Sequence, residues 1–139
     1  MRLLIDTNVI LDYLLNNPGF GDDANKIFAL STDVEAYEFV SSSAITDVFY
    51  VVRKAWHDSF AAQQVISDLM DFLTILEVGK EDIEMAISLH WKDFEDAVQY
   101  AVALSNNVDY IISRNGKDFE SQVIPVLTPK EFLNSIGKL

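Results

Sequence analysis

Four separate segments of the sequence place carboxylate, amide or hydroxyl side chains next to short apolar runs. Asp6 directly follows the run at residues 3–5, and Asp47 comes five residues after a second run at residues 39–42. The other side chains of this kind flank a fourth run: Asp93, Glu95, Asp96, Ser113, Asn115 and Asp118. Two carboxylates about 4 Å apart repel by roughly 4 kcal/mol at an effective dielectric constant of about 20. A site that gathers three of them therefore needs a bound cation or a proton.

The available donor atoms indicate which cation such a site would bind. The chain has no cysteine, and His57 and His90 lack the spacing of a zinc-binding helix, so we interpret each as a helix-surface or helix-end residue. Sites made of oxygen ligands select Mg²⁺ or Mn²⁺, and no EF-hand spacing is present to favour Ca²⁺. A carboxylate-held ion of this kind is suited to phosphate chemistry, in which metal-activated water attacks phosphorus.

The elements that position these residues are short strands separated by helices. Apolar runs occur at residues 3–5, 39–42, 74–78, 109–113 and 123–127, and longer segments with helical periodicity lie between them. Strands that are apolar on both faces predict an α/β fold with a mostly parallel sheet covered on both sides. Ligands of such sheets bind beyond the carboxyl ends of the strands. With no linker or repeat, residues 1–139 are expected to form a single domain.

Helix capping is a competing interpretation for each acid, because an Asp in the first turn accepts from free backbone N–H groups. We predict such a cap for Asp93, and Asp6 stands where it could cap the first helix. Asp12, six residues into that helix, is expected on a solvated face. Thr128 and Glu131, with proline between them, predict a capping box at the start of the last helix.

Composition limits the partners. Ten Lys and Arg residues against 22 Asp and Glu residues give a net charge of −12, so no overall basic field attracts nucleic acid. Bound divalent cations can reverse the charge locally, and Lys92, Arg114 and Lys117 flank the acids as candidate phosphate contacts. No window of about 18 consecutive apolar residues and no signal-peptide pattern is present, so we expect a cytoplasmic protein without a membrane span.

The sequence resembles the PIN-domain nucleases, and in particular the ribonuclease toxins of type II toxin–antitoxin pairs. The matching segments, in order, are "LLIDTNVILDYL", "SSSAITDVFYVVRK", "KDFEDAVQYAVA" and "DYIISRNGKDF". The resemblance implies a three-layer α/β/α PIN-like fold with about four or five strands. It also implies endonucleolytic hydrolysis of RNA by Mg²⁺- or Mn²⁺-activated water, a homodimer, and inhibition by a small antitoxin protein.

The resemblance also assigns roles to individual residues. Asp6, Asp47 and Asp96 take the positions of the catalytic and metal-binding acids, and the supporting positions fall on Asn8, Asp93, Ser113, Asn115 and Asp118. Two departures stand out. Asp47 is one methylene shorter than the usual Glu, and Asn115 is neutral where the family has a fourth acid, for which Asp118 is a possible substitute.

Other classes of protein remain as alternatives. A catalytically degenerate PIN domain would act as a partner-binding module. A phosphatase of the haloacid dehalogenase type also has an Asp after its first strand, but its second Asp would fall at Asn8. A response-regulator receiver domain would place an acid at the end of a middle strand, and the third run here ends at residues 78–79 without one.

Overall fold

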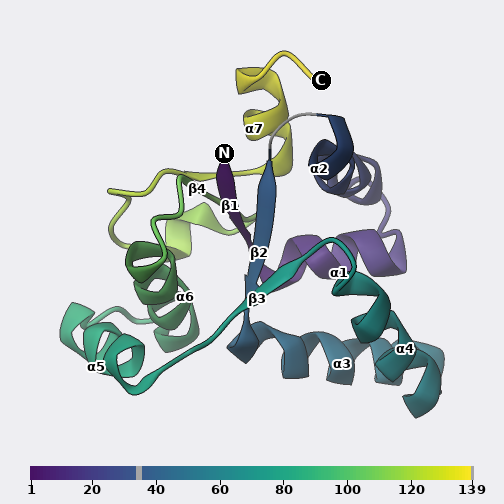
Figure 1. The fold of residues 1–139 in the computed structure, drawn as a ribbon, viewed down its shortest axis with the longest axis horizontal. Coiled ribbons are helices and arrows are strands. Elements are labelled where there is room, and N and C mark those ends of the chain that lie inside the picture. The colour runs from purple at the N-terminus through teal and green to yellow at the C-terminus, as the bar shows by residue number, and fades with distance from the viewer. Residues whose placement is uncertain (34–35, 139) are drawn as a thin grey trace.

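The computed structural model describes residues 1–33 and 36–138, and within them a five-stranded sheet forms the centre of the molecule (Figure 1). The strand order is β3-β2-β1-β4-β5, and all four neighbouring pairs are parallel. The strands are β1 (Arg2–Ile5), β2 (Tyr37–Ser41), β3 (Thr74–Leu76), β4 (Tyr110–Ile112) and β5 (Val126–Leu127). The predicted parallel α/β sheet is therefore confirmed.

Helices cover both faces of this sheet and complete three layers. One side carries α1 (Thr7–Leu15), α2 (Gly21–Asp33), α3 (Ser42–Trp56), α4 (Ser59–Leu69) and α7 (Pro129–Ser135). The other side carries α5 (Lys80–Leu89) and α6 (Phe94–Ser105), and a short 3₁₀ helix, η1 (Gly116–Asp118), follows β4. Each face of the sheet has its own apolar core, beneath the helices that Figure 1 shows on that side.

The central place of β1 between two layers of helices explains why Leu3, Leu4 and Ile5 are all apolar. Leu3 and Ile5 belong to the core beneath α1, α2, α3 and α7, whereas Leu4 belongs to the core beneath α6. Successive side chains of a strand point to opposite faces, and in this strand each face meets a layer of helices. All three side chains are fully buried.

The strand register brings the ends of β1, β4 and β5 to one edge. Ile5 is paired with Ile112, and Ile112 with Leu127. The Asp6 N–H donates to the carbonyl of Ile112 at 2.9 Å, and the Ser113 N–H donates to that of Leu127 at 2.9 Å. Asp6 and Ser113, which directly follow β1 and β4, therefore lie at the same carboxyl edge of the sheet.

The strand boundaries differ from the sequence prediction in several places. β2 begins at Tyr37, and Ser42 is already the first residue of α3. The fifth apolar run contributes only Val126–Leu127, because Val123 is exposed. β3 ends at Leu76, so an acid, Glu77, does follow it; its side chain is exposed and takes no part in the acidic contacts described below.

The predicted helix ends are present. Thr128 and Glu131 form the reciprocal capping box of α7. His57 and His90 are the left-handed residues that end α3 and α5, as expected of helix-end histidines. Among the described residues, no helix is long and apolar enough to cross a membrane.

Candidate active site

Asp6 is buried at the start of α1 and accepts four hydrogen bonds. Its Oδ1 accepts from the backbone N–H of Thr7 at 2.7 Å and from Gln99 Nε2 at 2.9 Å. Its Oδ2 accepts from Ser113 Oγ at 2.7 Å and from Asn8 Nδ2 at 3.3 Å. Four donors compensate for the hydration that a buried carboxylate loses, and they fix its orientation. Asp6 therefore caps its helix and also stands at the centre of a polar network.

Gln99 is a member of this network that the sequence prediction missed. It lies one turn after Asp96 on α6, its side chain is buried, and its Oε1 has no hydrogen-bond partner among the described residues. A signal was present in the sequence, since Gln99 interrupts an otherwise apolar helix segment three residues after an acid. Residues with that spacing share one helix face.

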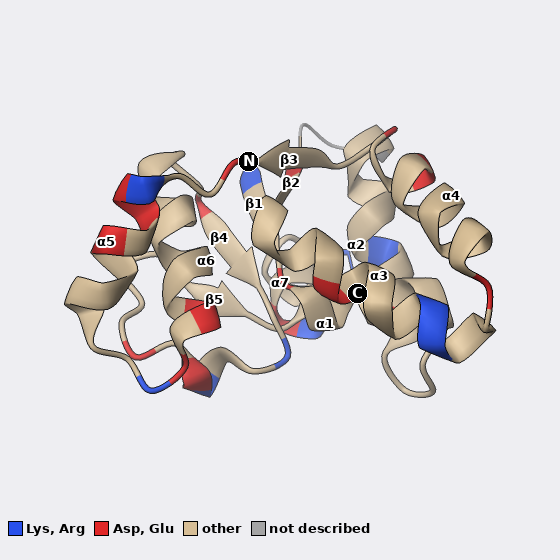
Figure 2. Cartoon of the chain, turned by 90° about the horizontal axis from the view of Figure 1, so that it is seen from below, with Lys and Arg blue, Asp and Glu red and all other residues tan. Residues whose placement is uncertain are grey.

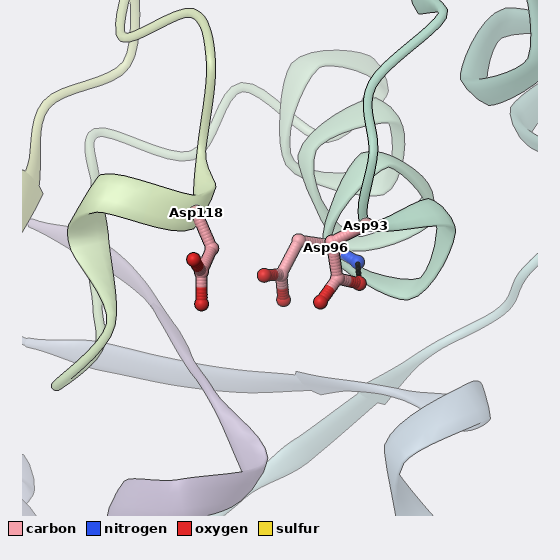
Figure 3. A group of neighbouring side chains, drawn as sticks. All are labelled: Asp93, Asp96 and Asp118. Carbon is pink, nitrogen blue, oxygen red and sulfur yellow. Dashed lines mark hydrogen bonds between the residues drawn. The ribbon is translucent and has the colours of Figure 1, made fainter.

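A second group of acids lies at the start of α6. Asp93 is the N-cap and accepts from the backbone N–H of Asp96 at 3.0 Å, so the predicted cap is confirmed. The carboxylates of Asp93, Asp96 and Asp118 each offer an oxygen within 4.8 Å of the others (Figure 3). Asp118 reaches this group from η1, on the opposite side in the figure. Asp118, the acid three residues after Asn115, therefore lies in this acidic group.

Asp96 connects the two groups electrostatically. Its side chain is 8% exposed, and no hydrogen bond to its carboxylate is present among the described residues. The pKa of Asp96 is raised to about 7, mainly by burial and then by the charges of Asp6, Asp93, Asp118 and Glu95 in that order. A carboxyl with such a pKa and no donor is suited to receive a cation.

Asp47 comes to the same edge from α3, where it meets Glu95 of α6. The pKa of Glu95 is raised to about 7. Burial is the largest cause, the interaction with Asp47 comes next, and the charges of Asp6 and Asp93 contribute least. Charge interactions through Glu95 and Asp96 relate Asp47 and Asp6 to this edge, but the group whose carboxylate oxygens lie within 4.8 Å of one another is Asp93, Asp96 and Asp118 and includes neither Asp6 nor Asp47. Glu95, which the candidate ligand set omitted, is the residue that joins Asp47 to the others.

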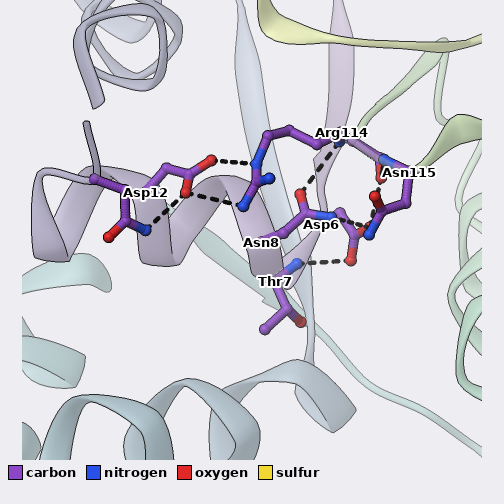
Figure 4. Close-up of polar contacts among 8 residues, drawn as sticks. Asp6, Thr7, Asn8, Asp12, Arg114 and Asn115 are labelled. Atoms are coloured by element: carbon purple, nitrogen blue, oxygen red, sulfur yellow. Dashed lines mark hydrogen bonds and ion pairs between the residues drawn. The ribbon is translucent and has the colours of Figure 1, made fainter. Parts of the chain in front are cut away.

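Asn8 and Asn115 belong to the loops around Asp6. Asn8 donates to Asp6 through Nδ2 and accepts from the backbone N–H of Arg114 through Oδ1 at 3.3 Å, which ties α1 to the loop after β4. The backbone N–H of Asn115 donates to Ser113 Oγ at 3.0 Å (Figure 4). Both asparagines therefore hold the loop that carries Ser113 against Asp6.

Asp12 and Arg114 correct the sequence interpretation. Asp12 is not solvated but 1% exposed, because the Arg114 guanidinium covers it with Nε and Nη2 at 2.6 and 3.1 Å from its two oxygens (Figure 4). Asn17 Nδ2 donates to the same carboxylate at 2.8 Å, and the Arg114 Cζ lies 4.1 Å from the centre of the Phe20 ring. Arg114 is thus bound to Asp12 and is not a free cation at the acidic group.

Lys92 and Lys117 remain available as charged side chains. Both are exposed, they precede Asp93 and Asp118 in the sequence, and neither forms an ion pair with another described residue. Figure 2 shows the few basic positions scattered over the chain rather than gathered on one face. The positive charge near the acids therefore comes from single lysines.

The donor set fits a hard divalent cation. All the candidate ligands are carboxylate oxygens, Asp96 is buried without a hydrogen bond to its carboxylate, and the pKa values of Glu95 and Asp96 are raised to about 7 by burial and by neighbouring negative charge. Mg²⁺ and Mn²⁺ prefer such oxygen ligands, and they would relieve the repulsion among these groups.

Fold and site together define a three-layer α/β protein with an all-oxygen acidic site at the carboxyl edge of a parallel sheet. Comparison with known families makes the assignment specific. The family model described as PIN domain matches residues 2–117, and the chain belongs to that family. The fold and the family inferred from the four sequence motifs are thereby confirmed.

Relatives of known name share the whole domain. The chain is 33% identical over 140 residues to Ribonuclease VapC1 of Aquifex aeolicus (strain VF5), covering 94% of this chain and 92% of that protein. A toxin–antitoxin complex from Klebsiella pneumoniae contains a chain that superposes with a TM-score of 0.68 at 25% identity, covering 91% of this chain and 97% of the other. VapBC-1 from nontypeable Haemophilus influenzae has the same fold, with a TM-score of 0.69 at 17% identity and coverage of 94% and 99%.

Proposed function

We propose that this protein is a Mg²⁺- or Mn²⁺-dependent endoribonuclease that acts as the toxin of a toxin–antitoxin pair. The observation that carries the proposal is the acidic edge of the sheet, where carboxylate oxygens of Asp93, Asp96 and Asp118 lie within 4.8 Å of one another and Gln99 of α6 donates to Asp6. The relative named a ribonuclease, 33% identical over nearly the whole chain, supports RNA as the substrate.

In this proposal Asp6, Asp47 and Asp96 hold the cation. The chemistry that the cation supplies when bound is activation of water and stabilisation of the charge that develops at phosphorus. Gln99, Ser113 and Asn8 orient the Asp6 carboxylate through the hydrogen bonds described above.

The two departures from the usual family residues are each compensated by a nearby carboxylate. Glu95, whose pKa is raised in part by the charge of Asp47, adds a longer side chain where Asp47 is short. Asp118, together with Asp93, adds negative charge where Asn115 is neutral. Compensation by neighbours favours an active enzyme over a degenerate binding module.

Lys92 and Lys117 are the proposed phosphate contacts of the RNA. Both are exposed beside the acids, where their charge complements the substrate backbone. We further propose a homodimer and a cognate antitoxin, acting in the cytoplasm. Support for these comes from the Klebsiella pneumoniae chain solved in a toxin–antitoxin complex and from exposed apolar side chains on α3 and α4, among them Tyr50, Trp56 and Phe60.

Cleavage of RNA in the presence of Mn²⁺ tests the proposal. Wild-type protein is expected to cut RNA internally, and EDTA, Asp6→Asn and Asp96→Asn are each expected to abolish the cutting. Glu84→Gln, which changes an exposed acid on α5, serves as the matched control. Cutting that survives both active-site substitutions would refute the assignment of these residues.

A further inference from the structure

A cavity of about 320 Å³ lies at the carboxyl ends of β4 and β5, where Arg114 and Thr128 follow the strands. Side chains and backbone from three segments line it, including Gly19, Phe20, Asp23, Arg114, Thr128 and Lys130. The volume lies at the small end of the usual range for ligand pockets, about 300 to 1,000 Å³. Ligands of parallel α/β sheets bind outside the carboxyl ends of the strands, and the cavity lies there.

One loop separates this cavity from the acids. Ser113 directs its hydroxyl to Asp6. The next residue, Arg114, lines the cavity and directs its guanidinium to Asp12 (Figure 4). The backbone N–H of Arg114 also donates to Asn8, which itself donates to Asp6. A chain molecule bound at the acids would therefore reach the cavity by crossing a single loop.

The chemistry of the cavity wall suits a flat aromatic ligand. Phe20 is 46% exposed, and the Arg114 guanidinium packs on its ring. Two hydrogen bonds to Asp12 hold that guanidinium in place, so the ring has a fixed support. Bases of single-stranded RNA stack on aromatic rings and on guanidinium planes.

A lysine at the cavity offers a contact for the phosphate of a nucleotide. Lys130 is exposed at the cavity and forms no ion pair with another described residue, while Asp12 already neutralises Arg114. Asp23 also lines the cavity, so its charge is mixed, and Lys130 beside the exposed Phe20 ring offers a nucleotide one contact for a phosphate and one for a base.

We propose that this cavity is a nucleobase subsite, which binds a nucleotide of the RNA substrate next to the phosphodiester bond that is cut. Phe20 stacks on the base and Lys130 contacts a phosphate. The inference rests on the proposed ribonuclease function, and it adds a second contact region outside the acidic cluster.

Binding of a fluorescein-labelled single-stranded RNA hexamer in EDTA, followed by anisotropy, tests the subsite without cleavage. Phe20→Ala is expected to weaken binding about 5- to 150-fold, the range measured when one base-stacking aromatic is removed. Phe20→Tyr keeps a ring and is expected to bind like the wild type. Tyr37→Ala, at a 63% exposed ring at the start of β2, is the control and leaves affinity unchanged.

Lys130→Ala gives a second, independent readout, because this exposed side chain can be removed without disturbing the core. Loss of one phosphate contact is expected to reduce the slope of log affinity against log salt concentration by about 0.7. Thermal unfolding of each variant shows that it is folded before its affinity is interpreted.

The outcomes separate the subsite from the enzyme. RNA affinity that is the same in wild type, Phe20→Ala and Lys130→Ala overturns the subsite, as does a Phe20→Ala protein that loses only the binding of a protein partner. Wild type that binds RNA through Phe20 but never cuts it in Mn²⁺ leaves the subsite standing and refutes the ribonuclease. RNA cleavage by Phe20→Ala with the wild-type KM refutes the subsite and leaves the ribonuclease function standing.

Discussion

Protons are expected to compete with the cation at the acidic site, and the raised pKa values set the size of the effect. In the metal-free protein Asp96 and Glu95 both have a pKa raised to about 7, with burial as the largest cause and neighbouring acids next. At pH 8 about nine tenths of each carboxyl is ionised, and at pH 6 only about one in eleven. If both must lose a proton to bind Mn²⁺, the apparent affinity falls about 100-fold from pH 8 to pH 6.

Isothermal titration calorimetry of Mn²⁺ binding at pH 6, 7 and 8 measures this dependence. In Glu95→Gln only the Asp96 proton remains, so the change over the same interval is expected to shrink to about tenfold. Glu84→Gln is the control, and it is expected to keep the full 100-fold change. An affinity equal at pH 6 and pH 8, or a Glu95→Gln protein with an undiminished change, would refute the reasoning.

Three further predictions concern stability. Burial raises the pKa of Glu38, whose two side-chain oxygens have no partner among the described residues, from 4.5 to about 8. Because the folded state then holds the proton more tightly than the unfolded chain, the contribution of Glu38 to stability is complete below pH 4.5 and decreases by roughly 5 kcal/mol as pH rises through 8. Urea unfolding should show that Glu38→Gln removes most of this fall; an unchanged slope would contradict it. Gln99→Leu removes a donor to a buried carboxylate and should cost about 1.5 to 3 kcal/mol, with Gln64→Leu, which loses an exposed hydrogen bond, as the comparison in thermal unfolding. Asp12→Ala should cost about 3 kcal/mol, the low end for a broken buried ion pair because the Arg114 side chain is 32% exposed; denaturant titration giving under 1 kcal/mol would show that the pair is not structurally important.

The sheet and its functional edge could be predicted because their signals are local. Leu3, Leu4 and Ile5 are apolar without alternation, which is typical of a strand covered on both faces, and an acid follows directly. The ends of the strands have no such local signal. Val123 and Pro125 continue an apolar run in sequence, but in the fold Val123 is exposed, and no local pattern distinguishes it from Val126.

The contacts that the sequence could not give are those between distant segments. Asp12 and Arg114 are 102 positions apart, so nothing around either residue indicates that a guanidinium will cover the carboxylate. The same holds for Gln99, which lies 93 positions from Asp6. In sequence, Glu95 does not differ from other acids in a first helical turn. Its interaction with Asp47 depends on the approach of α6 to α3 in the fold.

The central claim is that the acids at the sheet edge bind the cation with which RNA is cut, and one titration tests it directly. The rate of RNA cleavage is measured against Mn²⁺ concentration at pH 8 and compared with Mn²⁺ binding by calorimetry under the same conditions. We predict that the two curves reach half-saturation at the same concentration in the wild type and that Asp96→Asn loses both. Cleavage in EDTA, or cleavage by Asp96→Asn at the wild-type rate, would contradict the claim.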